Sequence, residues 1–142
     1  MKNIRETCEL CHRYGVPVNM DSARFAENSY FIKTREEGDA DKPTQEIARE
    51  MSSYAASMSM SAKKDGIVNM GGFIATNRED WYEGCKRYCI PYEGFITYGG
   101  MNGRDMAALA VGLEENTQFD MLQTRIHQVE YLAELLDEYG IP

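Results

Sequence analysis

The stretch Ser57-Met58-Ser59-Met60-Ser61-Ala62-Lys63-Lys64-Asp65 decides how this chain is interpreted. Its first four residues are small or apolar, which is typical of a short buried strand. Two adjacent lysines then follow the strand, and an aspartate follows the lysines. Earlier in the chain, Pro17-Val18-Asn19-Met20 predicts a second short strand, which ends on Asp21. Charged groups of opposite sign are therefore expected at the carboxyl ends of two strands.

Strands and helices alternate in the first half of the chain and helices dominate the second half, which predicts an α/β fold. The expected strands are residues 16–20, 57–60 and 71–76, and a first helix is expected to stop at Gly15. The other expected helices are residues 23–37, 44–54, 77–89, 104–115 and 119–139, with a glycine-rich loop over residues 91–102. The 142 residues contain no internal repeat or low-complexity linker, so a single domain with a buried core is expected.

Composition excludes several classes of function. The net charge of −8 argues against nonspecific binding to nucleic acid, which requires a basic surface. No apolar run approaches the roughly 18 residues that a membrane-spanning helix needs. Without an apolar signal region at the N-terminus, a reducing, cytoplasmic location is the default expectation, with the four cysteines as free thiols.

A lysine and an aspartate at the carboxyl ends of strands are what a pyridoxal phosphate enzyme requires. In open α/β sheets ligands bind beyond these ends, so both side chains are expected to face one crevice. The lysine forms a Schiff base with the cofactor, and the aspartate keeps the pyridine nitrogen protonated so that the ring withdraws electrons. Judged on local chemistry alone, the lysines also fit the solvated end of a surface strand.

Longer stretches of the sequence resemble the tryptophanase (tryptophan indole-lyase) family and its sister family, the tyrosine phenol-lyases. The similar stretches are residues 20–33, 60–65, 68–73, 92–94, 97–100 and 103–106. Asp21-Ser22-Ala23-Arg24 and Ser61-Ala62-Lys63-Lys64 are more similar to the tryptophanase versions. The resemblance covers nearly the whole chain, from about Asn3 to Pro142.

Members of this family are much longer, so the chain is expected to be an internal segment. The resemblance implies the three-layer α/β/α large domain of a fold-type I pyridoxal phosphate enzyme. Residues 1–142 would form the C-terminal part of that domain and the start of its connection to the small domain.

The resemblance assigns catalytic roles to three residues. Lys64, the second lysine of the pair, would hold the cofactor, and Asp21 would pair with the pyridinium nitrogen. Arg24 would lie near the phenolic oxygen of the cofactor, where a cation favours the deprotonated oxygen. The structural alternatives are a turn aspartate for Asp21 and a surface arginine paired with Glu27 or Asn28 for Arg24.

Further binding roles follow from the same resemblance. The Ser61 hydroxyl would contact the cofactor phosphate. On physical grounds, the positive charge of Lys63 beside Lys64 would favour the neutral, nucleophilic form of Lys64. The backbone carbonyl of Asn69 would help to bind a monovalent cation such as potassium. Tyr98 would approach the active site of a neighbouring subunit.

The implied activity is β-elimination from an aromatic amino acid, with L-tryptophan giving indole, pyruvate and ammonia in a homotetramer. Tyrosine phenol-lyase is the alternative within this class, and a noncatalytic remnant domain is the alternative outside it. The phosphate-binding loop and the arginine that grips the substrate carboxylate would both lie outside residues 1–142. The isolated segment is therefore expected to be inactive.

Two cysteine patterns suggest other chemistry. Cys8-Glu9-Leu10-Cys11-His12 has the C-x-x-C-H spacing of haem attachment, but it lies in a predicted helix without an export signal. Cys8 and Cys11, with Cys85 and Cys89, have spacings that a zinc site tolerates. Structural zinc usually binds cysteines in loops or turns, so buried free thiols are the preferred interpretation.

Overall fold

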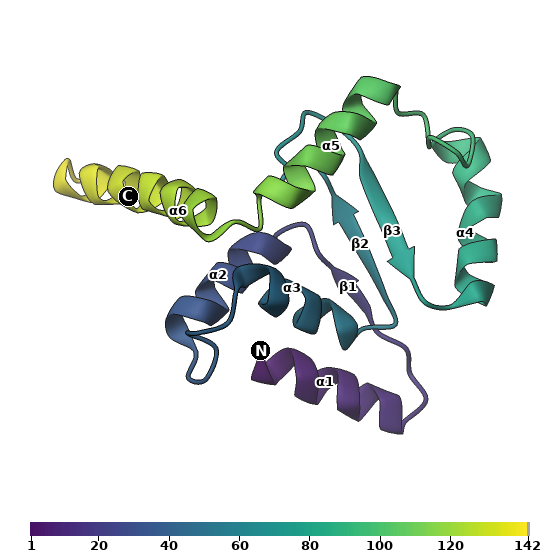
Figure 1. Ribbon diagram of the computed structural model, residues 1–142, viewed down its shortest axis with the longest axis horizontal. Helices are drawn as coiled ribbons and strands as arrows, with labels where there is room; N and C mark the ends of the chain where they lie inside the picture. Colours follow the sequence, from purple (N-terminus) through teal and green to yellow (C-terminus); the bar gives the residue numbers. More distant parts are fainter. Residues whose placement is uncertain (142) are drawn as a thin grey trace.

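The computed structural model describes residues 1–141 (Figure 1). The helices are α1 (Lys2–Arg13), α2 (Phe25–Arg35), α3 (Thr44–Ser53), α4 (Glu79–Tyr92), α5 (Gly103–Glu115) and α6 (Phe119–Glu138). The strands are β1 (Asn19–Asp21), β2 (Ser57–Ser61) and β3 (Gly72–Thr76). The fold is therefore the mixed α/β arrangement that the sequence predicts.

The three strands form one sheet in the order β1-β2-β3. β1 and β2 are parallel, with Asn19 opposite Ser57 and Asp21 opposite Ser59. β3 runs antiparallel to β2, as the arrows in Figure 1 show. Because side chains alternate along a strand, Met20 lies on one face of β1 and the polar residues Asn19 and Asp21 lie on the other.

The main core lies on the Met20 face of the sheet. Ile32 of α2 and Ile47 and Met51 of α3 form a buried cluster, and Met20 packs against it. Ile4 of α1 contacts the same cluster, so three helices cover one side of β1. The apolar residues of α3 recur at helical spacing, which directs them to one face of that helix.

A second core joins the beginning of α6 to α2. Leu122 and Ile126 pack against Ala26 and Tyr30, and the Tyr30 ring stacks on Phe119 with centroids 5.4 Å apart. The rest of α6 extends away from the sheet (Figure 1), and its apolar side chains Val129, Leu132 and Leu136 are exposed. The sequence pattern predicts this helix but not the exposure of its second half.

The expected elements are all present, several of their boundaries shift by one or two residues, and the largest differences are at the first strand and the fourth helix. The first strand begins at Asn19 rather than at residue 16, because Pro17 has no N–H for the ladder and Val18 contributes only its carbonyl. The fourth helix continues through Pro91 to Tyr92. Its last turn closes because the N–H groups of Glu93 and Gly94 both donate to the carbonyl of Cys89.

The sequence offers Thr44 or Asp41 as the cap of α3, but neither residue occupies the N-cap position. Pro43 occupies the N-cap position, and the Thr44 hydroxyl donates instead to the carbonyl of Thr117 at 2.5 Å. This contact ties the start of α3 to the segment between α5 and α6. Among residues 1–141, no helix is both long and apolar enough to cross a membrane.

Candidate active site

The candidate site lies at the edge of the sheet where the parallel strands β1 and β2 both end. Asp21 is the last residue of β1, and Ser61 is the last residue of β2. Lys63 and Lys64 occupy the turn directly after Ser61. Parallel pairing therefore places the aspartate and the two lysines at the same edge, as the sequence predicts.

Asp21 is exposed, and its side chain stabilises the turn that precedes α2. Its Oδ1 accepts a hydrogen bond from the N–H of Ala23 at 3.2 Å, and the Asp21 side chain thus forms the turn that leads from β1 into the helix. One carboxylate oxygen serves this turn, and the exposed side chain can still reach a ligand. The turn role and the cofactor role are therefore compatible.

Arg24 pairs with Glu27, the structural alternative that the sequence left open. The Nη1 atom of Arg24 lies 3.2 Å from both carboxylate oxygens of Glu27, and Arg24 remains exposed. A second arginine, Arg125 of α6, donates to Oε1 of the same carboxylate at 3.0 Å. Glu27 therefore has two cationic partners, Arg24 and Arg125.

The lysine turn is compact. The carbonyl of Ser61 accepts the N–H of Lys64, and the carbonyl of Lys64 accepts the N–H of Ile67, both at 3.4 Å. Lys63 is exposed, whereas Lys64 is half-buried. Ile67 adopts φ of 54°, a left-handed conformation that is unfavourable for a β-branched residue. Backbone strain of this kind often accompanies functional turns.

A polar ladder runs across the face of the sheet that carries Asp21. Asn19 accepts from the Ser57 hydroxyl at 2.8 Å and donates to the Ser59 hydroxyl at 3.2 Å. Ser61 continues this row by strand alternation and is half-buried beside the lysine turn. The Ser61 hydroxyl, at the lysine end of this row, is of a type that can donate to an anionic group.

Asn69 and Tyr98 lie outside this edge arrangement. Asn69 is exposed in the segment between β2 and β3, and Tyr98 is exposed after α4. The role of the Asn69 backbone carbonyl in binding a cation stays a prediction. The role of Tyr98 at a neighbouring subunit stays a prediction as well.

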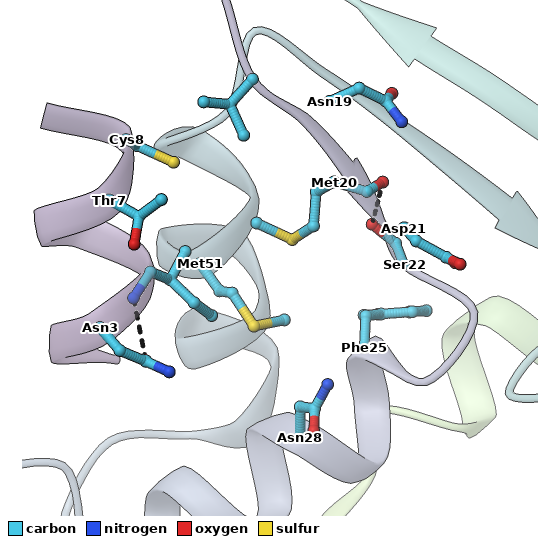
Figure 2. A pocket seen from close by; sticks show the side chains of 12 residues that line it. Asn3, Thr7, Cys8, Asn19, Met20, Asp21, Ser22, Phe25, Asn28 and Met51 are labelled. Carbon is cyan, nitrogen blue, oxygen red and sulfur yellow. Dashed lines mark hydrogen bonds between the residues drawn. The ribbon is translucent and has the colours of Figure 1, made fainter. Parts of the chain in front are cut away.

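A groove of about 310 Å³ lies on the opposite side of β1, between that strand and α1 (Figure 2). Met20 points into it and Cys8 and Met51 line it, whereas the carboxylate of Asp21 points away from α1. Neither lysine lines this groove. The groove and the lysine turn therefore lie on different sides of β1.

The four cysteines lie on two helices. All four are free thiols, with Cys8 and Cys11 on α1 and Cys85 and Cys89 on α4. Within residues 1–141, no three His, Cys, Asp or Glu side chains are grouped closely enough to hold a metal ion. Burial, with a smaller contribution from Cys11, raises the pKa of the Cys8 thiol above 9.0 and makes it a weaker nucleophile.

The edge residues fit pyridoxal phosphate by the chemistry of their donor set. Asp21 offers an exposed carboxylate for a pyridinium nitrogen, and Lys64 offers an amine from the adjacent strand end. Arg24 is an exposed cation just before α2, Ser61 carries a hydroxyl at the end of β2, and Lys63 is an exposed positive charge beside Lys64. These groups come from the ends of two adjacent strands, the turn after β2 and the residue before α2.

The structure adds residues that the sequence did not single out. The Asp65 carboxylate, buried next to Lys64, accepts from the first-turn amides of α2. Asn116, also buried, donates from its side chain to the carbonyl of Asp65. Arg125 pairs with Glu27 across 98 positions of sequence. Local patterns cannot reveal such pairs, although the position of Asp65 directly after the lysines was a usable signal.

Comparison with known proteins gives a consistent result. A family model described as β-eliminating lyase matches residues 1–142. A probable β-eliminating lyase of Trichomonas vaginalis is 68% identical over the whole chain, which covers 31% of that protein. A tryptophanase of Salinibacter ruber is 49% identical, with 30% of its length covered, and a tyrosine phenol-lyase of Fusobacterium nucleatum is 48% identical, with 31% covered. The chain thus spans about a third of the length of these relatives.

Proposed function

The chain belongs to the β-eliminating lyase family, and from that premise we propose that it carries the cofactor lysine of a pyridoxal phosphate-dependent lyase. The observation that supports this most strongly is the shared sheet edge. Parallel pairing of β1 and β2 brings Asp21 and the Lys63-Lys64 turn together there. Residues 1–142 would form the C-terminal part of the large, three-layer domain and the start of its connection to the small domain.

Each edge residue then has a defined task. Lys64 would hold the cofactor through Nζ and would move the proton at the substrate α carbon. Asp21 holds a proton on the pyridine nitrogen, while Arg24 favours the deprotonated phenolic oxygen. Bound pyridoxal phosphate supplies the electron sink for elimination.

We propose L-tryptophan as the substrate, with indole, pyruvate and ammonia as products. The Asp21-Ser22-Ala23-Arg24 and Ser61-Ala62-Lys63-Lys64 motifs, which are more similar to tryptophanase, support this choice. L-tyrosine is the second candidate, because the tyrosine phenol-lyase of Fusobacterium nucleatum is 48% identical to the whole chain.

The assembled enzyme would be a homotetramer with a potassium ion held partly by the carbonyl of Asn69. A cytoplasmic location is in keeping with four free thiols.

A chimera tests the substrate. This chain would replace the matching segment of the Fusobacterium nucleatum relative, and indole release from L-tryptophan would be compared with phenol release from L-tyrosine. Indole should dominate, and Lys64→Ala should lower the rate by about 10²–10⁴-fold, the usual contribution of acid–base catalysis. Dominant phenol release would favour the second candidate. A folded, cofactor-loaded chimera without either product would support a noncatalytic domain.

A further inference from the structure

Asp65 caps helix α2 from the lysine turn. Its side chain is fully buried, and Oδ2 accepts from the N–H groups of Ala26 at 2.8 Å and Glu27 at 3.2 Å. First-turn amides have no acceptor within their own helix. The N-cap residue Arg24 makes no side-chain capping bond within residues 1–141. A residue next to Lys64 therefore supplies the cap that α2 lacks.

The main chain of Asp65 is held as well. Its N–H donates to the carbonyl of Ala23 at 3.3 Å, and its carbonyl accepts from the side chain of Asn116. Helix α5 also approaches closely, because a Cβ added at Gly112 would overlap the carbonyl oxygen of Gly66. The turn is thus fixed to α2 on one side and to α5 on the other.

The charge of Asp65 is only partly compensated. Its Oδ1 accepts no hydrogen bond from the described part of the chain, and the nearest cation is Arg125, with Nη2 at 3.8 Å. Burial raises the pKa of Asp65, against the lowering effect of the α2 amides and Arg125. The main contribution of this side chain to stability is therefore the two hydrogen bonds that it accepts from the α2 amides. These bonds require an acceptor oxygen more than a full negative charge.

We propose that Asp65 is a positioning residue that holds Lys64 in fixed relation to Asp21 and Arg24. Asp21 and Arg24 both lie in the short segment that enters α2. A cap that joins this segment to the lysine turn links all three groups into one unit. The catalytic importance of this unit rests on the proposed function. The link itself rests only on the hydrogen bonds between Asp65 and the start of α2.

The link has a measurable consequence for the two lysines. Lys63 is exposed and Lys64 is half-buried, so reagents reach them unequally while the turn is closed. Local opening of the turn exposes both amines alike. Weakening the cap should therefore reduce the difference between them.

The test uses the full chain without cofactor. Reductive methylation with formaldehyde and cyanoborohydride, read by tandem mass spectrometry, gives the labelling rates of Lys63 and Lys64. Hydrogen exchange of the Ala26 and Glu27 amides gives the strength of the cap. In Asp65→Ala the Lys63:Lys64 rate ratio should move about five-fold toward one, the factor expected for one net hydrogen bond.

Asp65→Asn keeps an acceptor oxygen and should stay within about two-fold of wild type in both readouts. Asp39→Ala is the matched control, because it removes another buried aspartate. The Asp39 carboxylate lies 2.7 Å from the amine of Lys42, and this ion pair is not part of the lysine turn. The control should leave the ratio unchanged. If Asp65→Ala does not fold, Asp65→Ser is used in its place. The serine side chain is one covalent bond shorter than that of aspartate, so its hydroxyl oxygen does not reach the α2 amides.

A ratio and amide exchange that are unchanged in Asp65→Ala, or in Asp65→Ser where the alanine variant does not fold, would overturn the proposal. A similar change of the Lys63:Lys64 rate ratio in Asp39→Ala would overturn it too, because the effect would then reflect general destabilisation. Addition of pyridoxal phosphate to wild type separates the two proposals. Absence of a lysine adduct, together with the expected methylation result, rejects the cofactor assignment and leaves the positioning link intact.

Discussion

Replacing Gly112 by alanine should destabilise the chain, although alanine is the better helix former. Gly112 is buried in α5, where an added Cβ would lie 3.1 Å from the carbonyl carbon of Gly66 and closer still to its oxygen. Both are backbone atoms of the lysine turn, which cannot yield as a flexible side chain does. Overpacking of this kind costs about 1–3 kcal/mol.

Gly84→Ala is the matched control. Gly84 lies inside α4, and among residues 1–141 no atom beyond its chain neighbours and the adjacent helix backbone lies within 4 Å of a Cβ added there. Both substitutions gain about 0.5–1 kcal/mol from helix propensity. The free energy of unfolding of the control should therefore rise by that amount. The free energy of unfolding of Gly112→Ala should lie about 1–3 kcal/mol below that of the control, because only the overlap differs.

Urea unfolding followed by far-ultraviolet circular dichroism measures both variants against wild type. Gly112→Ala should unfold at a lower urea concentration than wild type, and Gly84→Ala at a higher one. Equal stabilisation of the two variants would refute the close approach of α5 to the lysine turn.

Three further outcomes are expected. In the full-length chimera, Asp21→Asn should lower elimination by roughly 10²–10³-fold, as loss of a preorganised charge does. Its stability should stay within about 0.5 kcal/mol, because the exposed amide still accepts from Ala23; near-normal turnover would exclude Asp21 as the partner of the pyridine nitrogen. Burial raises the pKa of Asp65 above 3.8, so its contribution to stability is greatest when it is protonated and falls as pH rises through the folded-state value. The difference between the urea midpoints of Asp65→Asn and wild type should therefore become more positive as the pH is raised from about 4 to about 7. A difference that stays constant or falls over this range would contradict the burial effect. In maleimide alkylation near neutral pH, Cys8 should react more slowly than Cys85, because it is buried and burial raises its pKa; equal rates would show that α1 does not cover it.

Local patterns predicted most of the fold and the position of the candidate site. The run of small and apolar residues before Lys63 predicts β2, and Asp21 follows a similar short run, so the shared edge follows from sequence and parallel pairing. Gly15 and Gly140 end their helices at φ of 68° and 66°, as glycines after a helical pattern commonly do.

The parts that the sequence did not predict depend on contacts between distant segments. Thr44 has the composition of a cap, but its hydroxyl bonds to Thr117, which only tertiary packing brings near. Asp65 caps a helix that begins forty positions earlier (65 − 25), at Phe25. Propensities and periodicity describe neighbours along the chain, so they cannot identify such partners.

The attachment of the cofactor is the central claim, and one measurement tests it directly. The purified chain would be saturated with pyridoxal phosphate, reduced with borohydride, digested and mapped by tandem mass spectrometry. A single modified residue, Lys64, is expected, with loss of that label in Lys64→Arg and its retention in Lys63→Arg. Labelling of Lys63, labelling scattered over several lysines, or no adduct at all would contradict attachment of the cofactor at Lys64.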